Sequence, residues 1–140
     1  MSVSVFRTSS EGETIAVGRE IACALTRPVV VLLAGDLGAG KTTLAKGIVE
    51  GLGVALADEV SSPTCTLIHE YGHDVYHIDL YRLDTVDEVR RLGIDELIER
   101  NSIVLIEWGE RVPQLWPPDR IEIRIHAEDS ERQLAVTGLK

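Results

Sequence analysis

Two short runs of the chain are almost entirely apolar, and both are rich in β-branched residues. They cover residues 29–34 and 102–107. A strand that lacks a polar face is typical of the buried centre of a parallel sheet, where helices cover both sides. We therefore predict that the two runs are neighbouring strands in the core of the fold.

In three other segments the apolar residues recur at the spacing of a helix. Ser10 and Glu13 have the spacing of a capping box and mark the start of the first helix, which Arg27-Pro28 should end. Asp84 is expected to cap the third helix, which Gly93 divides in two. The second helix follows the first buried strand, and its apolar positions are Leu44, Ala45, Ile48, Val49 and Leu52.

Shorter segments alternate or flank tight turns, which indicates strands outside the buried centre. Residues 2–8 predict an edge strand, and residues 121–125 with 134–136 predict a terminal antiparallel hairpin. Residues 67–71 and 75–80 predict a hairpin or strand pair around a three-residue turn. Antiparallel strands are therefore expected at the edges of the sheet.

A glycine-rich turn joins the first buried strand to the second helix. Residues 35–43 read GDLGAGKTT and contain the phosphate-binding loop pattern Gly-x-x-x-x-Gly-Lys-[Ser/Thr]. Glycines let backbone N–H groups surround a phosphate, and the helix N-terminus adds a positive dipole end. Lys41 should reach the β- and γ-phosphates, and the Thr42 hydroxyl should bind Mg²⁺. The nucleotide-binding residues expected here are Asp36, Leu37, Gly38, Ala39, Gly40, Lys41, Thr42 and Thr43.

These patterns together predict an α/β fold of the P-loop NTPase type. We expect a mainly parallel sheet covered by helices, with antiparallel edge strands, in a single domain over residues 1–140. The two cysteines, Cys23 and Cys65, have neither a disulfide framework nor a metal-ligand spacing, so we interpret both as structural.

The charge balance limits the classes of partner. The chain has 14 Lys and Arg against 23 Asp and Glu, a net charge of -9, which argues against a broad basic surface for nucleic acid or anionic membrane. The longest apolar run is too short to cross a bilayer, and the N-terminus lacks the apolar core of a signal peptide. We therefore expect a cytoplasmic protein that does not enter a membrane.

A phosphate-binding loop needs an acidic residue at the end of a neighbouring strand to hold Mg²⁺. Glu107 ends the second buried strand and fits this place, although Asp is the usual residue there. Asp79 also ends a predicted strand and is the second candidate. Two carboxylates near one metal ion make hydrolysis or phosphoryl transfer plausible, with Asp79, Glu107 and Lys41 as the catalytic candidates.

Three further positions bear on the nucleotide. Trp108 follows Glu107, where it could cover the nucleotide, contact a partner or pack in the core. Thr64 and Thr66 lie in a hydroxyl-rich loop and could sense the γ-phosphate, or could simply be solvated. The guanine signature Asn-Lys-x-Asp is missing, because the single asparagine, Asn101, begins Asn-Ser-Ile-Val. ATP is therefore the expected nucleotide.

Four motifs in this order and spacing resemble the TsaE family of small bacterial ATPases. They are GDLGAGKTT, Ser62-Pro63-Thr64 with Thr66-Leu67, His77-Ile78-Asp79-Leu80-Tyr81-Arg82, and Ile106-Glu107-Trp108. The resemblance extends from about residue 10 to residue 132. The family serves the threonylcarbamoyladenosine (t6A) modification of transfer RNA, and Glu at the Mg²⁺-binding position agrees with its pattern.

The resemblance implies slow, Mg²⁺-dependent ATP hydrolysis that supports a TsaD and TsaB complex, which transfers the threonylcarbamoyl group. It implies that Glu107 binds Mg²⁺, that Asp79 is needed for hydrolysis, and that the Ser62-Pro63-Thr64 loop is a switch. By the same resemblance Glu11, Thr14 and Arg132 lie near the nucleotide. Direct contact with transfer RNA does not follow from it.

Two other functions use the same loop. A small-molecule kinase would use Arg90 and Arg91 as transition-state cations and would transfer phosphate faster than it hydrolyses ATP. A noncatalytic switch would bind a partner in a nucleotide-dependent way even after Asp79 is neutralised. Partner capture with and without ATP separates these functions best.

Overall fold

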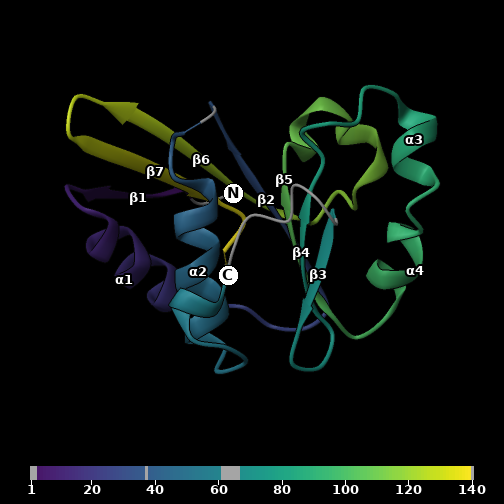
Figure 1. Cartoon of the computed structure of the whole chain (residues 1–140), viewed down its shortest axis with the longest axis horizontal. Coiled ribbons are helices and arrows are strands. Elements are labelled where there is room, and N and C mark those ends of the chain that lie inside the picture. The colour runs from purple at the N-terminus through teal and green to yellow at the C-terminus, as the bar shows by residue number, and fades with distance from the viewer. Residues whose placement is uncertain (1–2, 37, 61–66, 140) are drawn as a thin grey trace.

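The computed structural model describes residues 3–36, 38–60 and 67–139. In this part of the chain seven strands form one mixed sheet in the order β1-β7-β6-β2-β5-β4-β3 (Figure 1). The four inner strands β6, β2, β5 and β4 run parallel, and antiparallel strands lie at both edges. The strands are β1 Val3–Thr8, β2 Val29–Gly35, β3 Ile68–Tyr71, β4 Val75–Asp79, β5 Ile103–Glu107, β6 Ile121–Glu128 and β7 Glu131–Thr137.

This sheet confirms the predicted α/β class with its parallel core and antiparallel edge strands. The two buried runs are the neighbours β2 and β5, with Val29 opposite Ile103 and Leu33 opposite Glu107. Their residues are buried almost throughout, as expected for strands covered on both faces. The predicted hairpins are β3 with β4 and β6 with β7.

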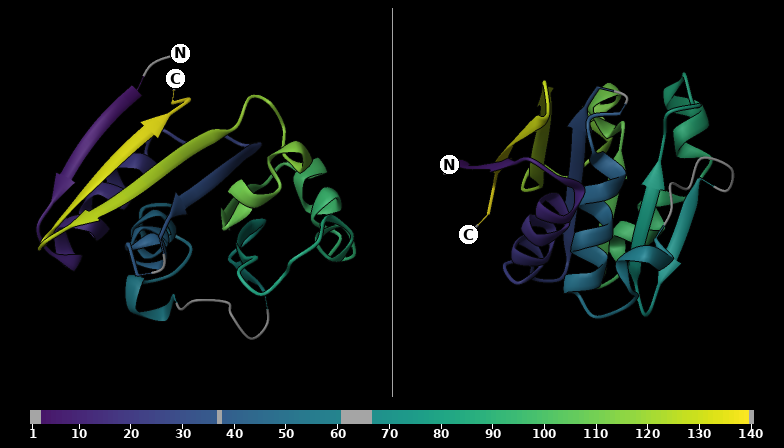
Figure 2. Two further views of the ribbon diagram at one scale, coloured as in Figure 1. Left: turned by 90° about the horizontal axis from the view of Figure 1, so that it is seen from above. Right: turned by 60° about the vertical axis from the view of Figure 1, so that its left-hand side comes forward.

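Helices cover both faces of the sheet, so the molecule has three layers. Helices α1 and α2 pack on one face, and α3 and α4 cover the other (Figure 2). Short 3₁₀ turns complete the connections. The helices are α1 Glu11–Ala22, α2 Lys41–Gly51, α3 Val86–Arg90 and α4 Ile94–Glu99, and the turns are η1 Ala57–Glu59, η2 Gly109–Arg111 and η3 Pro113–Leu115.

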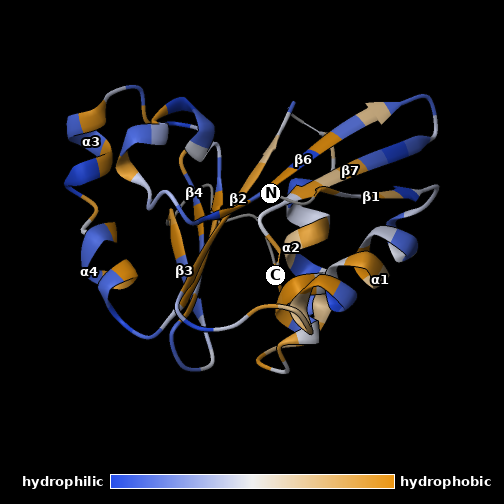
Figure 3. Ribbon diagram, turned by 180° about the vertical axis from the view of Figure 1, so that it is seen from behind, coloured by the Kyte–Doolittle hydropathy of each residue, from blue (hydrophilic) through white to orange (hydrophobic). Residues whose placement is uncertain are grey.

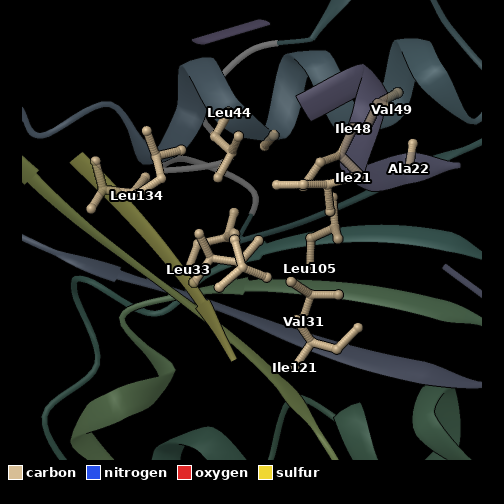
Figure 4. Packing of buried hydrophobic residues seen from close by; sticks show 14 of the residues in the cluster. Ile21, Ala22, Val31, Leu33, Leu44, Ile48, Val49, Leu105, Ile121 and Leu134 are labelled. Carbon is tan, nitrogen blue, oxygen red and sulfur yellow. The ribbon is translucent and has the colours of Figure 1, made fainter. Parts of the chain in front are cut away.

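The hydrophobic core is divided by the sheet into two clusters. Under α1 and α2, Leu44 and Ile48 face Leu33 and Leu105 of the central strands (Figure 4). On the opposite face Leu32 and its neighbours pack under α3, α4 and Trp116. Figure 3 shows the central strands in orange, whereas β6 and β7 alternate between orange and blue because one face of each is exposed.

Local contacts explain where the helices begin and end, and they confirm one prediction and correct two. Ser10 caps α1 by accepting a hydrogen bond from the Glu13 N–H at 3.1 Å, as its spacing predicts. The helix nevertheless ends at Ala22, before Arg27-Pro28, because Cys23 closes its last turn through backbone bonds. Thr85, not Asp84, caps α3, since its hydroxyl accepts from the Glu88 N–H at 3.2 Å.

Other predictions about these connections have mixed outcomes. Gly93 divides α3 from α4 as predicted, and its φ of 75° is a conformation that glycine adopts readily. Cys23 is a free thiol, as its lack of a disulfide spacing predicts; it is exposed, and its Sγ donates to the Arg19 carbonyl at 3.5 Å. Cys65 lies outside the described residues. In the described part of the chain, no helix has the length and apolar character needed to cross a membrane.

Candidate functional site

The topology brings five chain segments together at one end of the sheet, where the parallel inner strands finish. Strands β2, β5 and β4 are parallel neighbours, so Gly35, Glu107 and Asp79 lie together at their carboxyl ends. Strand β6 runs parallel to β2 and so finishes at the same end of the sheet. The antiparallel strand β7 therefore starts there. Strand β1 ends there too, because Thr8 pairs with Arg132. The N-terminus of α1, which follows β1, therefore also lies at this end of the sheet.

The phosphate-binding loop fills the gap between β2 and α2. Gly38 and Gly40 have φ values of 80° and 110°, which glycine adopts at no steric cost. Gly40 is the N-cap of α2 and provides no side-chain acceptor, so the first N–H groups of this 11-residue helix have no side-chain cap. Such N–H groups form a binding site for an anion, and the helix dipole strengthens it.

Lys41 begins α2 and is only 4 % exposed. Its ammonium donates to the Gly35 carbonyl at 2.6 Å and lies 3.2 Å from the centre of the Trp108 ring. Burial lowers the pKa of this ammonium, while the nearby carboxylates, that of Glu110 most strongly, act in the opposite direction. Lys41 is therefore a buried cation held in the loop by a carbonyl and an aromatic face.

Glu107, at the end of β5, is hydrogen-bonded to the helix α2 that follows the phosphate-binding loop. The Thr42 hydroxyl donates to its two carboxylate oxygens, at 3.0 Å to Oε2 and 3.3 Å to Oε1. His77 Nε2 lies 2.6 Å from the same Oε2. Glu107 is 3 % exposed, and a buried carboxylate needs such donors to remain ionised. The predicted Mg²⁺ ligands Thr42 and Glu107 are thus in direct contact.

Asp79 lies beside Glu107 and is also 3 % exposed. The two residues face each other across the β4–β5 pair. One carboxylate oxygen of Asp79 accepts from the Tyr81 N–H at 2.9 Å, and the Asp79 N–H donates to the Leu67 carbonyl at 3.0 Å. The carboxylate is therefore fixed at the end of its strand.

The oxygen atoms of these side chains are suited to bind magnesium together with a phosphate. No three His, Cys, Asp or Glu side chains cluster as a self-sufficient metal site within residues 3–36, 38–60 and 67–139. Mg²⁺ does not require one, because it usually takes one or two carboxylates and completes its shell with water and substrate phosphates. Thr42 and Glu107, with Asp79 beside them, supply hard oxygen ligands of this kind.

A cavity of about 310 Å³ lies on the other side of the loop. The three residues that the family resemblance places near the nucleotide line it: Glu11 and Thr14 from α1, and Arg132 from β7. The Arg132 Nε donates to the Ala39 carbonyl of the loop at 3.1 Å, which ties β7 to α2. The Thr14 hydroxyl is bonded to the Thr8 hydroxyl at 2.8 Å. The remaining lining residues are Ser9, Ser10, Gly38, Gly40, Thr43, Asp129 and Ser130.

Trp108 is half-buried and lies over the loop. Its φ of 67° is in the left-handed region, which a bulky residue rarely adopts and which costs about 1–3 kcal/mol. Arg111 lies 4.6 Å from the centre of the same ring, and the Tyr81 ring lies 5.1 Å away. Trp108 covers the Lys41 ammonium and also packs against the core cluster under α3 and α4, in which Trp116 is buried, so its expected roles stay predictions.

Some candidate residues fall outside this description, and others were missed. Leu37 and Thr64 are not among the described residues, so their expected roles stay predictions. His77 was noted only as part of a motif, although its position two residues before Asp79 places both on one face of β4. Glu110 was also missed. Its Oε1 is buried without a hydrogen-bond partner in the described part of the chain.

The chain is similar to proteins of one family over most of its length. The family model "Threonylcarbamoyl adenosine biosynthesis protein TsaE" matches residues 8–134. The "tRNA threonylcarbamoyladenosine biosynthesis protein TsaE" of Bacillus subtilis is 41% identical over 139 residues, which cover 96% of this chain and 85% of the relative. The protein of the same name from Nostoc is 40% identical over 134 residues, with 89% and 79% covered.

A solved structure agrees with these sequence matches. The crystal structure of Bacillus subtilis YdiB superposes with a TM-score of 0.77 at 34% sequence identity. The match covers 99% of this chain and 87% of that one. The match therefore spans the segments of this chain that form the loop, the carboxylate pair and the cavity.

Proposed function

The chain belongs to the TsaE family of threonylcarbamoyladenosine biosynthesis proteins, and from this premise we propose that it is a Mg²⁺-dependent ATPase. Membership assigns it to the t6A modification of transfer RNA. Slow ATP hydrolysis is the activity that we propose for it within that process. The observation that carries the proposal is the contact of Thr42 with Glu107 at the N-terminus of α2, beside the buried Lys41.

Phosphate recognition would be performed by the loop and the start of α2. Lys41 would exchange its bond to the Gly35 carbonyl for phosphate oxygens, where its charge offsets that of the β- and γ-phosphates. The N–H groups at the start of α2 would bind the remaining oxygens. On the far side of the loop, the cavity lined by Glu11, Thr14 and Arg132 would receive the nucleoside.

Hydrolysis would depend on the carboxylate pair. Thr42 and Glu107 would hold Mg²⁺, which supplies positive charge for the developing negative charge on the phosphates. Asp79, fixed by the Tyr81 N–H, would orient the attacking water and accept its proton as the bond between the β- and γ-phosphates breaks. Trp108 would cover the loop and limit access of other water.

Hydrolysis would be coupled to partner proteins. We place the chain with the TsaD and TsaB pair in the cytoplasm because it belongs to the TsaE family of threonylcarbamoyladenosine biosynthesis proteins. The net charge of -9 disfavours unaided docking of a transfer RNA. The partners would therefore hold the RNA, and this chain would supply the nucleotide-dependent step.

Three measurements on the purified protein test this function. Calorimetry should show ATP binding that Mg²⁺ strengthens, and phosphate release should require Mg²⁺ and rise when the TsaD and TsaB pair is added. A screen of small metabolites for phosphoryl acceptors should show no transfer above hydrolysis. Absence of ATP binding would overturn the nucleotide site, whereas fast phosphoryl transfer would favour a kinase.

A further inference from the structure

His77 is a fully buried polar residue in the centre of the sheet. It lies on β4, is 0 % exposed, and points to the face that α2 covers, as its neighbours Val75 and Asp79 do. A buried polar side chain is costly unless it is hydrogen-bonded. Its Nε2 meets this need with a single contact, 2.6 Å from Glu107 Oε2.

The contact completes a chain of three side chains that ends at the phosphate-binding loop. Glu107 Oε2 lies between His77 Nε2 at 2.6 Å and the Thr42 hydroxyl at 3.0 Å. One donor comes from the sheet and the other from α2. Because a glutamate has three rotatable side-chain bonds, two donors from different elements fix its carboxylate where a single donor would not.

Register explains why the residue at this position is glutamate. Asp79 pairs directly with Glu107, whereas His77 pairs with Leu105 and is therefore diagonal to Glu107. Diagonal neighbours are farther apart than directly paired residues, so only long side chains meet across the diagonal. The side chain of an aspartate at position 107 would be one methylene shorter and would not span this diagonal.

The hydrogen bond also indicates which ring nitrogen of His77 carries a proton. An ionised carboxylate can only accept, so the proton lies on Nε2 of His77. Nδ1 is buried and has no hydrogen-bond partner within the described residues.

We propose that His77 is the positioning residue of the Mg²⁺ site, and this inference rests on the proposed ATPase function. His77 holds the Glu107 carboxylate in its binding orientation from the side of the sheet, while Thr42 approaches from the loop. It touches neither nucleotide nor metal. Outer partners of metal ligands commonly change metal affinity by about 10–100-fold.

The test measures metal binding separately from hydrolysis. Mn²⁺ binding is measured by electron paramagnetic resonance in the presence of a non-hydrolysable ATP analogue, and analogue binding without metal is measured by calorimetry. His77→Leu should weaken Mn²⁺ binding about tenfold or more while metal-free analogue affinity stays within about twofold. His77→Gln retains a donor near the Nε2 position and should restore most of the affinity.

Two further variants separate positioning from general damage to the fold. Val75→Ala removes buried volume from the same face of β4 without touching Glu107, so it should lower Tm and leave Mn²⁺ affinity unchanged. Glu107→Asp shortens the proposed ligand itself and also breaks its bond to His77, so it serves as the background of a double-mutant cycle: adding His77→Leu to it should weaken Mn²⁺ binding little further, whereas additive losses would contradict the positioning role.

The outcomes distinguish this proposal from the function on which it rests. Parental Mn²⁺ affinity in His77→Leu would overturn the positioning role and leave the ATPase proposal intact. Equal losses in His77→Leu, His77→Gln and Val75→Ala would also overturn it, in favour of a structural histidine. A parent protein that binds the analogue but shows no Mn²⁺ binding would overturn the Mg²⁺-dependent function itself.

Discussion

Lys41 is held by contacts within the chain that a phosphate would have to replace. Its ammonium is bonded to the Gly35 carbonyl and lies against the Trp108 ring. Replacing Lys41 by Ala should weaken ATP binding about 10–100-fold, because hydrogen bonds to charged groups contribute about 1.5–3 kcal/mol each. Calorimetry measures this loss, and Lys46→Ala is the matched control because it removes the same charge elsewhere on α2. Equal ATP affinity in Lys41→Ala and the parent would show that the loop does not bind the phosphates of ATP.

The same lysine gives ATP binding a pH dependence. Burial lowers the pKa of Lys41 from its ordinary value of 10.5, and phosphates bind the charged ammonium. ATP affinity should therefore be complete below this lowered pKa and fall as pH rises through it. In Lys41→Arg the charge persists, so the affinity of that variant, measured by calorimetry over the same pH range, should not show this fall. Parallel curves for both proteins would assign the pH dependence to another group.

The two carboxylates should be separable by their roles. Glu107→Gln removes a charge from the proposed ligand of Mg²⁺, so it should weaken Mn²⁺ binding in the presence of an ATP analogue. Asp79→Asn should leave that binding largely intact and lower kcat about 10²-fold or more, because a proton acceptor is lost. Paramagnetic resonance and phosphate release measure the two effects. Asp79→Asn with parental turnover would remove Asp79 from the reaction.

At the scale of elements, the position of the loop depends on how closely α1 and α2 pack. A Cβ atom at Gly47 would lie 2.2 Å from the Ile15 carbonyl oxygen of α1. Gly47→Ala should lower the free energy of unfolding by about 1–3 kcal/mol, because the overlap outweighs the gain in helix propensity of about 1 kcal/mol. Urea denaturation followed by circular dichroism measures the change.

Gly12→Ala provides the matched control on α1. Its Cβ would meet only the Ser10 hydroxyl, at 3.9 Å, so the helix propensity of alanine should stabilise the fold by about 0.5–1 kcal/mol. If Gly47→Ala lowers the free energy of unfolding and Gly12→Ala raises it, the close packing of α1 on α2 accounts for the difference. Stabilisation by Gly47→Ala would contradict the close approach of the two helices.

Elements with a strong local signal were predictable from the sequence. The buried strands β2 and β5 follow from their apolar runs, and the loop follows from its glycines and Lys41. The parallel pairing of β6 with β2 was not predictable, because alternation along β6 defines its faces and not its neighbour. That pairing brings Arg132 to the loop, so from sequence its place at the site rested on family resemblance alone.

Other features of the site depend on contacts between elements distant in sequence. The Asp84 and Thr85 pair shows the limit of a capping signal, since both residues can cap and the backbone selects one. The left-handed backbone of Trp108 has no local signal, because glycine or asparagine is usual there. The bond between His77 and Glu107 requires the register of β4 on β5, which residue patterns leave open.

At the scale of the whole molecule, the site is connected to a segment that the sequence predicts to be a switch. The Leu67 carbonyl accepts the Asp79 N–H at 3.0 Å, and Leu67 itself has a left-handed φ of 66°. Leu67 directly follows residues 61–66, whose structure lies outside the described residues. Asp79 is therefore linked to this segment by one backbone hydrogen bond to Leu67 and the peptide bond that precedes Leu67.

This link predicts how partner proteins would change hydrolysis. We expect the TsaD and TsaB pair to raise the rate of ATP hydrolysis, since a partner that binds one state of the switch shifts its population. Thr64→Ala should reduce this stimulation more than it reduces ATP affinity, because its hydroxyl is expected to sense the γ-phosphate. Thr26→Ala, an exposed change before the amino end of β2, should alter neither. Hydrolysis and co-elution are measured with ATP and ADP, and unchanged turnover without a nucleotide-dependent complex would contradict coupling.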